Sequence, residues 1–244
     1  MPSRFVTSFS ILAVTIAAGL SAGSASRAAP ASSSRAASAE HPIVVELFQS
    51  QGCSSCPPAN AYLNRVIDRP EILALSFAVT YWDQLGWKDS FASPTYTARQ
   101  QDYARAGRGE VATPEIIVNG THAVLGSDRS QLDAALASAG PARGGPEIVP
   151  ESSGIRIAQG AAGAPATVWL VRYDPRARQV AIRAGENGGK TLPHRGIVRQ
   201  LIKLGEWTGP SVKFALPLAR ESGLATAALV QHGAGGPIIA ARKL

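Results

Sequence analysis

Short apolar runs alternate with helical patterns in the segment that follows the N-terminal region. Residues 43–48 (IVVELF) and 72–80 (ILALSFAVT) are continuous runs of apolar and β-branched side chains, which predict two buried strands. Between them, residues 57–67 place apolar side chains at helical spacing, on the face formed by Tyr62, Leu63, Val66 and Ile67. The pattern therefore predicts a strand, a helix and a second strand.

The next elements are marked by capping and turn residues. Ser93 suits an N-cap and Pro94 the first helical position, so a helix is predicted to begin there and to end near Gly107. The dipeptide Asn119-Gly120 separates two short apolar runs, EIIV and THAVL. Asn-Gly in that setting predicts a β-hairpin.

A third helix over residues 127–139 completes a predicted α/β domain at 40–140, with a four-stranded mixed sheet. The breaking sequence PARGGP at 141–146 predicts a domain boundary. Beyond it, 147–244 is expected to be a mostly-β accessory domain of the sandwich type, in which 193–204 forms a short helix or another strand. The predicted strands of this part are 154–158, 166–173, 178–184, 211–216, 225–231 and 237–242.

The N-terminus has the features of an export signal. Arg4 precedes a short apolar run at 5–20, and small residues follow it at the cleavage positions. We therefore expect a signal peptide over 1–25, a low-complexity leader over 26–39, and a periplasmic or secreted protein. The alternative is a retained membrane anchor, but the run is short for a membrane span, so no stable span is expected after cleavage.

Charge and composition narrow the function classes. The 244 residues carry a net charge of +7, with 45% hydrophobic and 17% charged residues, which excludes a wholly disordered chain. Without the three arginines of residues 1–39, 21 basic residues face 17 acidic ones, a balance of +4. These basic residues are scattered, so no nucleic-acid partner is expected.

The two cysteines form one C-x-x-C motif, Cys53-Ser54-Ser55-Cys56. Thiol–disulfide exchange needs an accessible thiolate that attacks and a second thiol that resolves the mixed disulfide. A strand before the motif and a helix after it place the sulfurs at a helix N-terminus, where the dipole stabilises a thiolate. Cys53 is the expected nucleophile and Cys56 the resolving thiol, with protein or small-molecule disulfides and thiols as substrates and a redox partner for turnover.

Three other roles for the cysteine pair remain open. A structural disulfide is one, although closing a four-residue loop contributes only about 2 kcal/mol in the chain-entropy description. A metal site is the second, including copper handling, but one C-x-x-C supplies two ligands and the four histidines are isolated in sequence. Inert thiols are the third. No cofactor is expected.

Two further features are candidate substrate contacts. Thr113-Pro114 stands directly before the strand EIIV, where the proline is either an ordinary strand-start residue or a cis residue that leaves the Thr113 backbone free to pair with a peptide. Trp82 and Trp87 lie in an aromatic loop after the second strand. They form a peptide-binding lip or pack the loop onto the sheet; packing is the favoured interpretation, and both roles are compatible.

The stretches VVELFQSQGCSSCPPANAYL, YWDQLGWKDSFASPTYTARQQDYA and TPEIIVNG resemble a secreted thioredoxin-like family catalogued as domain of unknown function 1223. The resemblance is close over 43–140 and continues more loosely to the C-terminus. It implies an α/β thioredoxin-like N-terminal domain and a cis Pro114. It also suggests that the turn Gly185-Glu186-Asn187-Gly188-Gly189 faces the redox site. It supplies no established reaction.

Several residues depart from ordinary thioredoxins. Gly52 stands before the first cysteine in place of tryptophan, and the pair between the cysteines is Ser-Ser. Glu46 is one residue further from the motif than the usual buried acid, so it is either a proton shuttle or a strand-end surface acid. Pro57-Pro58 delays the regular helix and leaves the motif in a looser turn. The leading hypothesis is an exported thiol–disulfide oxidoreductase; the alternative is a non-catalytic binding or docking module with a permanent disulfide.

Overall fold

The two apolar runs of the N-terminal segment form neighbouring parallel strands. In the computed structural model, which describes residues 1–3 and 36–244, β1 (Ile43–Gln49) pairs with β2 (Ile72–Ala78) from Ile43 opposite Ile72 onward. Every residue of both strands is buried, as expected for strands covered on both faces. The predicted signal peptide and most of the predicted leader fall on 4–35, outside the described residues.

Three α-helices occur among the described residues, and each begins near its predicted start. α1 (Pro57–Val66) opens with two prolines, and α2 (Pro94–Arg105) is capped by the Ser93 hydroxyl, which accepts from Thr95 N. α3 (Arg129–Ser138) is capped by Asp128 rather than by Ser127, with its carboxylate accepting from Gln131 N at 3.0 Å. A short 3-10 turn, η1 (Asp83–Leu85), lies between β2 and α2.

The predicted hairpin is present. β3 (Glu115–Val118) pairs antiparallel with β4 (His122–Leu125), and Asn119 and Gly120 at the turn have φ values of 48° and 66°. Two consecutive positive φ values are what a two-residue hairpin turn needs, and Asn-Gly adopts them at low cost. β3 also pairs antiparallel with β1, so the hairpin extends the sheet beside the predicted cysteine motif.

The later part of the chain is built of strands, as predicted. The segment 193–204, which the sequence left open between helix and strand, belongs mainly to the 11-residue strand β10. Two short strands, β5 and β9, were not predicted. The strands of this part are β5 (Ile148–Glu151), β6 (Gly154–Ile157), β7 (Ala166–Asp174), β8 (Arg178–Ala181), β9 (Thr191–His194), β10 (Ile197–Trp207), β11 (Val212–Ala215), β12 (Ala225–His232) and β13 (Ile238–Lys243).

The predicted fold class, an α/β thioredoxin-like N-terminal domain with a mostly-β, sandwich-like C-terminal part, is wrong. Strands far outnumber helices among the described residues, and one mixed eight-stranded sheet takes strands from both segments in the order β13-β12-β7-β10-β2-β1-β3-β4. The reason lies at the outer edge of β2, where Ile197 pairs with Ser76 and Ser76 N donates to Gly196 O at 2.7 Å. An unpaired edge leaves backbone groups unsatisfied, and local sequence patterns do not reveal which distant strand will cover it.

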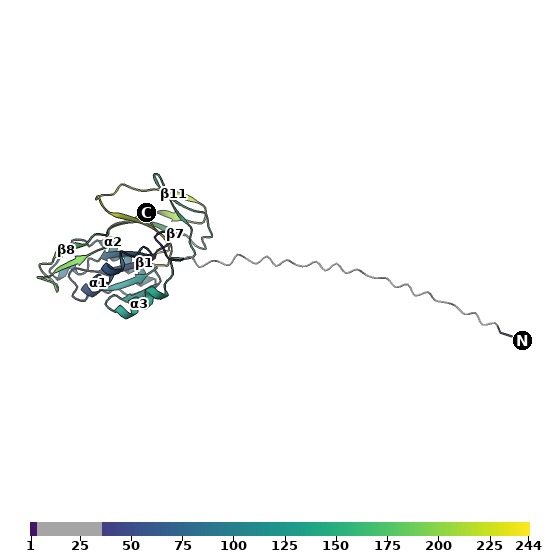
Figure 1. Ribbon diagram of the computed structural model, residues 1–244, viewed down its shortest axis with the longest axis horizontal. Coiled ribbons are helices and arrows are strands. Elements are labelled where there is room, and N and C mark those ends of the chain that lie inside the picture. Colours follow the sequence, from purple (N-terminus) through teal and green to yellow (C-terminus); the bar gives the residue numbers. More distant parts are fainter. Residues whose placement is uncertain (4–35) are drawn as a thin grey trace. The chain divides into compact units, whose positions relative to one another are not determined.

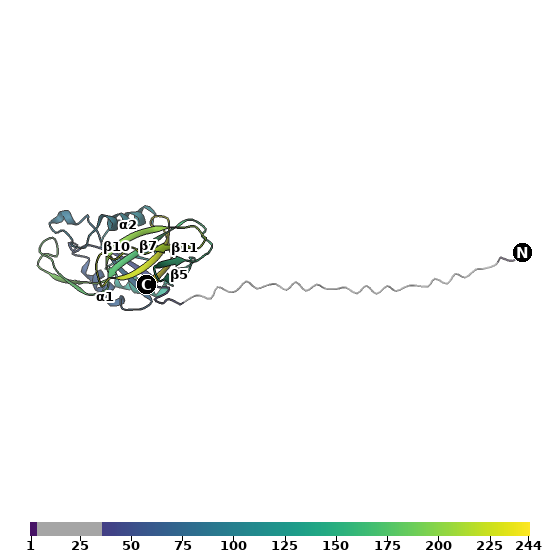
Figure 2. The ribbon, with the colours of Figure 1, turned by 90° about the horizontal axis from the view of Figure 1, so that it is seen from above.

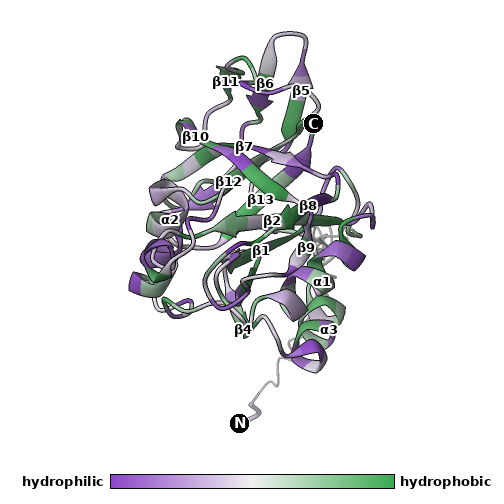
Figure 3. Cartoon of the chain, turned by 90° about the vertical axis from the view of Figure 1, so that its left-hand side faces the viewer, coloured by the Kyte–Doolittle hydropathy of each residue, from purple (hydrophilic) through white to green (hydrophobic). Residues whose placement is uncertain are grey.

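The large sheet has helices on both faces. α1 and α3 pack on Val45 and Leu47 of β1, while Tyr96 and Tyr103 of α2 pack on the opposite face with Val44 and Phe48. The small sheet β11-β6-β5 lies at the end of the molecule opposite α1 and α3 (Figures 1 and 3). Seen from above, β7 and β10 lie side by side, in agreement with their antiparallel pairing (Figure 2). β8 and β9 form a separate two-stranded ribbon.

Candidate active site

The cysteine motif lies between the end of β1 and the start of α1. Cys53 and Cys56 are joined by a disulfide, and Cys56 N donates to Cys53 O at 3.2 Å to close the turn. α1 begins at Pro57, so the pair occupies the turn that leads into the helix, as the two prolines predicted. Both cysteines are buried, with 0% of Cys53 and 1% of Cys56 exposed, whereas Ser54 and Ser55 between them are exposed.

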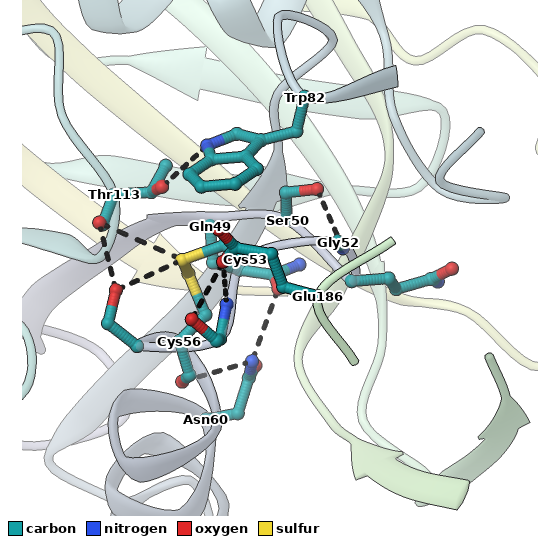
Figure 4. The surroundings of a disulfide bond; sticks show 12 residues. Gln49, Ser50, Gly52, Cys53, Cys56, Asn60, Trp82, Thr113 and Glu186 are labelled. Carbon is teal, nitrogen blue, oxygen red and sulfur yellow. Dashed lines mark hydrogen bonds between the residues drawn. A yellow bond between two sulfur atoms is a disulfide. The ribbon is translucent and has the colours of Figure 1, made fainter. Parts of the chain in front are cut away.

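The Thr113–Pro114 segment faces the disulfide across the site. The peptide bond is cis, as the resemblance implied, and Thr113 O lies 3.8 Å from Cys53 Sγ. The Ser55 hydroxyl lies 3.2 Å from the same sulfur and donates to Thr113 O at 3.4 Å (Figure 4). A backbone carbonyl and a hydroxyl group therefore sit together at the sulfur of the predicted nucleophile.

The two loop tryptophans reach different parts of this site. Trp82 Nε1 donates to the Thr113 hydroxyl at 2.8 Å, and Trp87 Nε1 donates to Gln51 Oε1 at 2.9 Å. The Trp82 indole lies over the sulfur region in Figure 4. Both side chains are half-buried, so they fasten the loop after β2 to the cysteine turn and keep part of each ring at the surface.

A buried carboxylate, that of Asp89, is hydrogen-bonded to the backbone just before the cysteine turn. Asp89 is 3% exposed and accepts from Gln51 N at 2.8 Å and from Phe91 N at 2.8 Å. Burial raises the pKa of Asp89 to about 6, and these two backbone hydrogen bonds oppose the rise. The Gln51 side chain also donates to the Ser90 hydroxyl at 3.1 Å. The residues before Cys53 are thus held by the loop that carries the tryptophans.

The connection between β8 and β9 covers the other side of the turn. Asn187 Nδ2 donates to Gln51 O at 2.9 Å and to Cys53 O at 2.7 Å, and Asn187 is only 1% exposed. Glu186 accepts from Ser54 N at 2.9 Å and from the Ser54 hydroxyl at 2.7 Å. The sequence did not assign these two residues a role; the only indication was the turn that resembles the family pattern.

The structure does not bring Glu46 to the cysteines. Its side chain is fully buried on the face of the sheet that α2 covers, where it accepts from Arg99 Nε at 2.7 Å and from the Tyr103 hydroxyl. Arg99 also donates to Gln231 Oε1 at 3.0 Å. The surface-acid alternative is excluded by this burial, and the proton-shuttle role stays a prediction.

Other candidate chemistry is limited in the described part of the chain. No group of three or more His, Cys, Asp or Glu side chains is placed there to hold a metal ion. His194 is 1% exposed, neither of its ring nitrogens has a hydrogen-bond partner, and burial lowers its pKa to about 4. Within residues 1–3 and 36–244, the helices are too short or too polar to span a bilayer.

The site is thus a C-x-x-C disulfide at the end of a central strand. A cis X-Pro segment lies on one side of it, and a turn from the later part of the chain lies on the other. The family described as Protein of unknown function (DUF1223) matches residues 44–231, from β1 to the end of β12. The chain belongs to this family.

Two solved structures are similar. The crystal structure of protein AGR_C_4864 from Agrobacterium tumefaciens is 32% identical, with a TM-score of 0.66 and coverage of 83% of this chain and 93% of that chain. HBP35 of Porphyromonas gingivalis is 13% identical, with a TM-score of 0.52 and coverage of 84% and 75%, and this likeness concerns the fold alone. No curated protein matches the chain.

Proposed function

We propose that the protein is a thiol–disulfide oxidoreductase that uses the Cys53–Cys56 pair. The main support for the proposal is the cysteine pair itself. It forms a disulfide across a short turn at the end of a strand, and Thr113 O and the Ser55 hydroxyl lie beside the sulfur of Cys53. A cross-link over four residues contributes little to stability, so a role in exchange explains the pair better than a role in folding.

The exchange balances as two thiolate displacements. The Cys53 thiolate attacks one sulfur of a substrate disulfide, the substrate S–S bond breaks, and the first substrate thiolate leaves. The Cys56 thiolate then attacks Cys53 Sγ in the mixed disulfide and releases the second substrate thiol. The substrate gains two electrons and two protons, the protein ends as the observed disulfide, and a redox partner with a dithiol restores it. In the reverse direction the protein oxidises a substrate dithiol.

The assignment of roles rests on position. Cys53 is further from α1 and next to Thr113, where a substrate backbone can approach, whereas Cys56 is the N-cap residue of α1. The Ser55 hydroxyl is placed to donate a hydrogen bond to a Cys53 thiolate, which stabilises the charged form. In this proposal Thr113 and Pro114 orient the substrate backbone and Trp82 and Trp87 flank it.

The proposal includes the compartment and the partners. A disulfide persists in an oxidising environment, and the N-terminal features of the sequence are typical of a cleaved signal peptide. We therefore place the protein in the periplasm or outside the cell, with protein or small-molecule disulfides and thiols as its substrates.

A second candidate function is a binding or docking module with a permanent disulfide. The observation that favours it is burial, since 0% of Cys53 and 1% of Cys56 are exposed while the β8–β9 connection holds the turn. Under this alternative the pair never exchanges, and the surface around Trp82 and Trp87 is the docking surface.

The test is exchange with a model peptide that contains one disulfide. Each protein is first reduced chemically and freed of reductant; the wild-type protein should then release peptide thiols, Cys56→Ser should accumulate a mixed disulfide at Cys53, and Cys53→Ser should do neither. Peptide thiols are counted by alkylation, and the adduct is located by mass spectrometry. A wild-type protein that is as inert as Cys53→Ser would refute catalysis and favour the docking module.

A further inference from the structure

The carboxylate of Glu186 is hydrogen-bonded to Ser54, the residue that directly follows the proposed nucleophile Cys53. Its Oε2 accepts both the backbone N–H and the hydroxyl of Ser54, at 2.9 and 2.7 Å. Ser54 directly follows Cys53, so the negative charge sits against the turn that carries the proposed nucleophile (Figure 4). The two hydrogen bonds lower the pKa of Glu186, which is therefore ionised at neutral pH.

The chain holds Glu186 in this place with buried contacts. The neighbouring Asn187 donates to both Gln51 O and Cys53 O and is itself 1% exposed. Gly185 has a φ of +73°, and a Cβ there would lie 3.3 Å from Trp87 Cβ. This close approach requires a residue without a side chain. The turn is thus fixed to the cysteine motif rather than passing over it freely.

A carboxylate hydrogen-bonded to the residue that follows Cys53 adds a negative charge to the cysteine turn, and nearby negative charge disfavours a thiolate. It also occupies the Ser54 N–H, which is therefore not available to a substrate. The other charged groups bonded to this part of the site are Asp89, on Gln51 N, and Lys190, whose Nζ donates to Asn187 Oδ1 at 3.0 Å. Neither of these is bonded to Ser54.

We propose that Glu186 is a positioning residue that sets the reactivity of Cys53: by binding Ser54 it fixes the cysteine turn and disfavours the Cys53 thiolate. The inference rests on the proposed function, because it assigns Cys53 as the reacting thiol. It predicts that the pair is held in the disulfide form more firmly than the same motif without Glu186.

The experiment compares wild type with Glu186→Gln, which keeps the size of the side chain and removes its charge. Both proteins are reduced chemically, and the alkylation rate of Cys53 is followed against pH by mass spectrometry. In Glu186→Gln we expect the pH of half-maximal alkylation to fall by about half a unit to one unit. At a pH above the Cys53 pKa of both proteins, the equilibrium with glutathione should shift about three- to tenfold toward the reduced pair.

Two further variants separate charge from structure. Glu186→Asp keeps the charge and should retain most of the wild-type alkylation profile. Glu206→Gln removes a surface carboxylate that pairs with Lys203 in β10, away from the site, and should match wild type. Near-ultraviolet circular dichroism checks that each variant is folded.

The inference is overturned if Glu186→Gln and wild type share one alkylation profile and one glutathione equilibrium. The alkylation profile does not depend on catalysis, because it is measured after chemical reduction. A wild-type protein that fails to exchange with the model peptide therefore overturns the proposed function alone, and the shift in the profile still decides the role of Glu186.

Discussion

Two polar clusters join β1 to the later part of the chain, and they are built differently. The disulfide cluster lies at the end of the strand and consists of Gln51, Cys53, Ser54, Cys56, Asp89, Thr113, Glu186 and Asn187. The Glu46 cluster lies inside the sheet core and consists of Glu46, Arg99, Tyr103 and Gln231. Their longest hydrogen bonds span 136 and 132 residues of sequence.

The Glu46 cluster is sealed from solvent, with side-chain exposures of 0% for Glu46 and 5% for Arg99. Burial alone would lower the pKa of Arg99, but the Glu46 carboxylate and Tyr103 outweigh burial and raise it. The disulfide cluster instead has exposed serines and an exposed Glu186 around a buried pair. The inner cluster is therefore buried throughout and supports folding, whereas the outer cluster places a buried disulfide directly beneath exposed residues.

The largest expected effect comes from breaking the inner cluster. Arg99→Met leaves the Glu46 carboxylate buried without its cation, so the free energy of unfolding should fall by about 3–5 kcal/mol. Urea denaturation followed by circular dichroism measures the loss. Lys203→Met breaks an ion pair whose side chains are about half exposed and should cost less than about 1 kcal/mol. A loss in Arg99→Met no larger than in this control would contradict the sealed-cluster description.

A second effect is the dependence of stability on pH. Asp89 has a folded pKa of about 6 against 3.8 in the reference state, so its contribution to stability is lost as the pH rises from about 4 to about 6. His194 has a folded pKa of about 4 against 6.5, so its contribution is lost as the pH falls from about 6.5 to about 4. Each is on the order of 3 kcal/mol, and the two oppose each other.

Replacing one of the two residues should therefore reveal the pH dependence of stability that the other residue causes. Asp89→Asn should lose more stability than wild type between pH 7 and pH 4.5, and His194→Phe should lose less. Urea denaturation at a series of pH values gives the slopes. If the free energies of unfolding of wild type and both variants depend on pH in the same way, then neither Asp89 nor His194 has a different pKa in the folded and unfolded states.

Asn187→Ala tests how firmly the β8–β9 connection holds the outer cluster. It leaves Gln51 O and Cys53 O without the amide that serves both, so we expect a loss of about 1–3 kcal/mol. The disulfide should also be reduced faster by dithiothreitol, because the cover over Cys53 is released. Asn64→Ala removes one hydrogen bond, to Pro193 O at 3.1 Å, and serves as the matched control. Equal reduction rates in wild type and Asn187→Ala would show that this connection does not limit access.

The smallest expected effect is that of Trp87→Phe, which deletes the hydrogen bond to Gln51 Oε1. If packing is its main role, stability falls by about 0.5–1.5 kcal/mol and the exchange rate with a model peptide is unchanged. Thermal denaturation and the peptide assay together separate the two roles. A slower exchange with unchanged stability would instead assign Trp87 to the substrate surface.

Local sequence patterns predicted most elements of the first half but not their partners. The Ser93 cap, the prolines before α1 and the Asn119-Gly120 turn act over a few residues, so the sequence pattern is enough to place them. The pairing of β10 with β2 depends on residues more than 100 positions apart, which no local pattern encodes. The predicted fold class, an α/β thioredoxin-like N-terminal domain, was wrong for that reason.

The site divides in the same way. Thr113 O lies 3.8 Å from Cys53 Sγ because β1, which leads to Cys53, and β3, which follows Thr113-Pro114, are neighbours in the sheet. Glu186 and Asn187 approach from 132 and 134 residues away and could not be placed by spacing. The role of Asp89 could not be predicted either, because its burial follows from how the loop after β2 folds back on Gln51.

The reduction potential of the Cys53–Cys56 pair distinguishes a pair that exchanges with thiols from a permanent disulfide. The full chain is equilibrated across a glutathione series, trapped by alkylation and resolved by mass. We expect exchange within the range of known oxidoreductases, with a potential near about −120 to −180 mV for an oxidant or isomerase and about −270 mV for a reductant. A pair that stays oxidised and lies below about −300 mV would mark a permanent disulfide and contradict the proposed function.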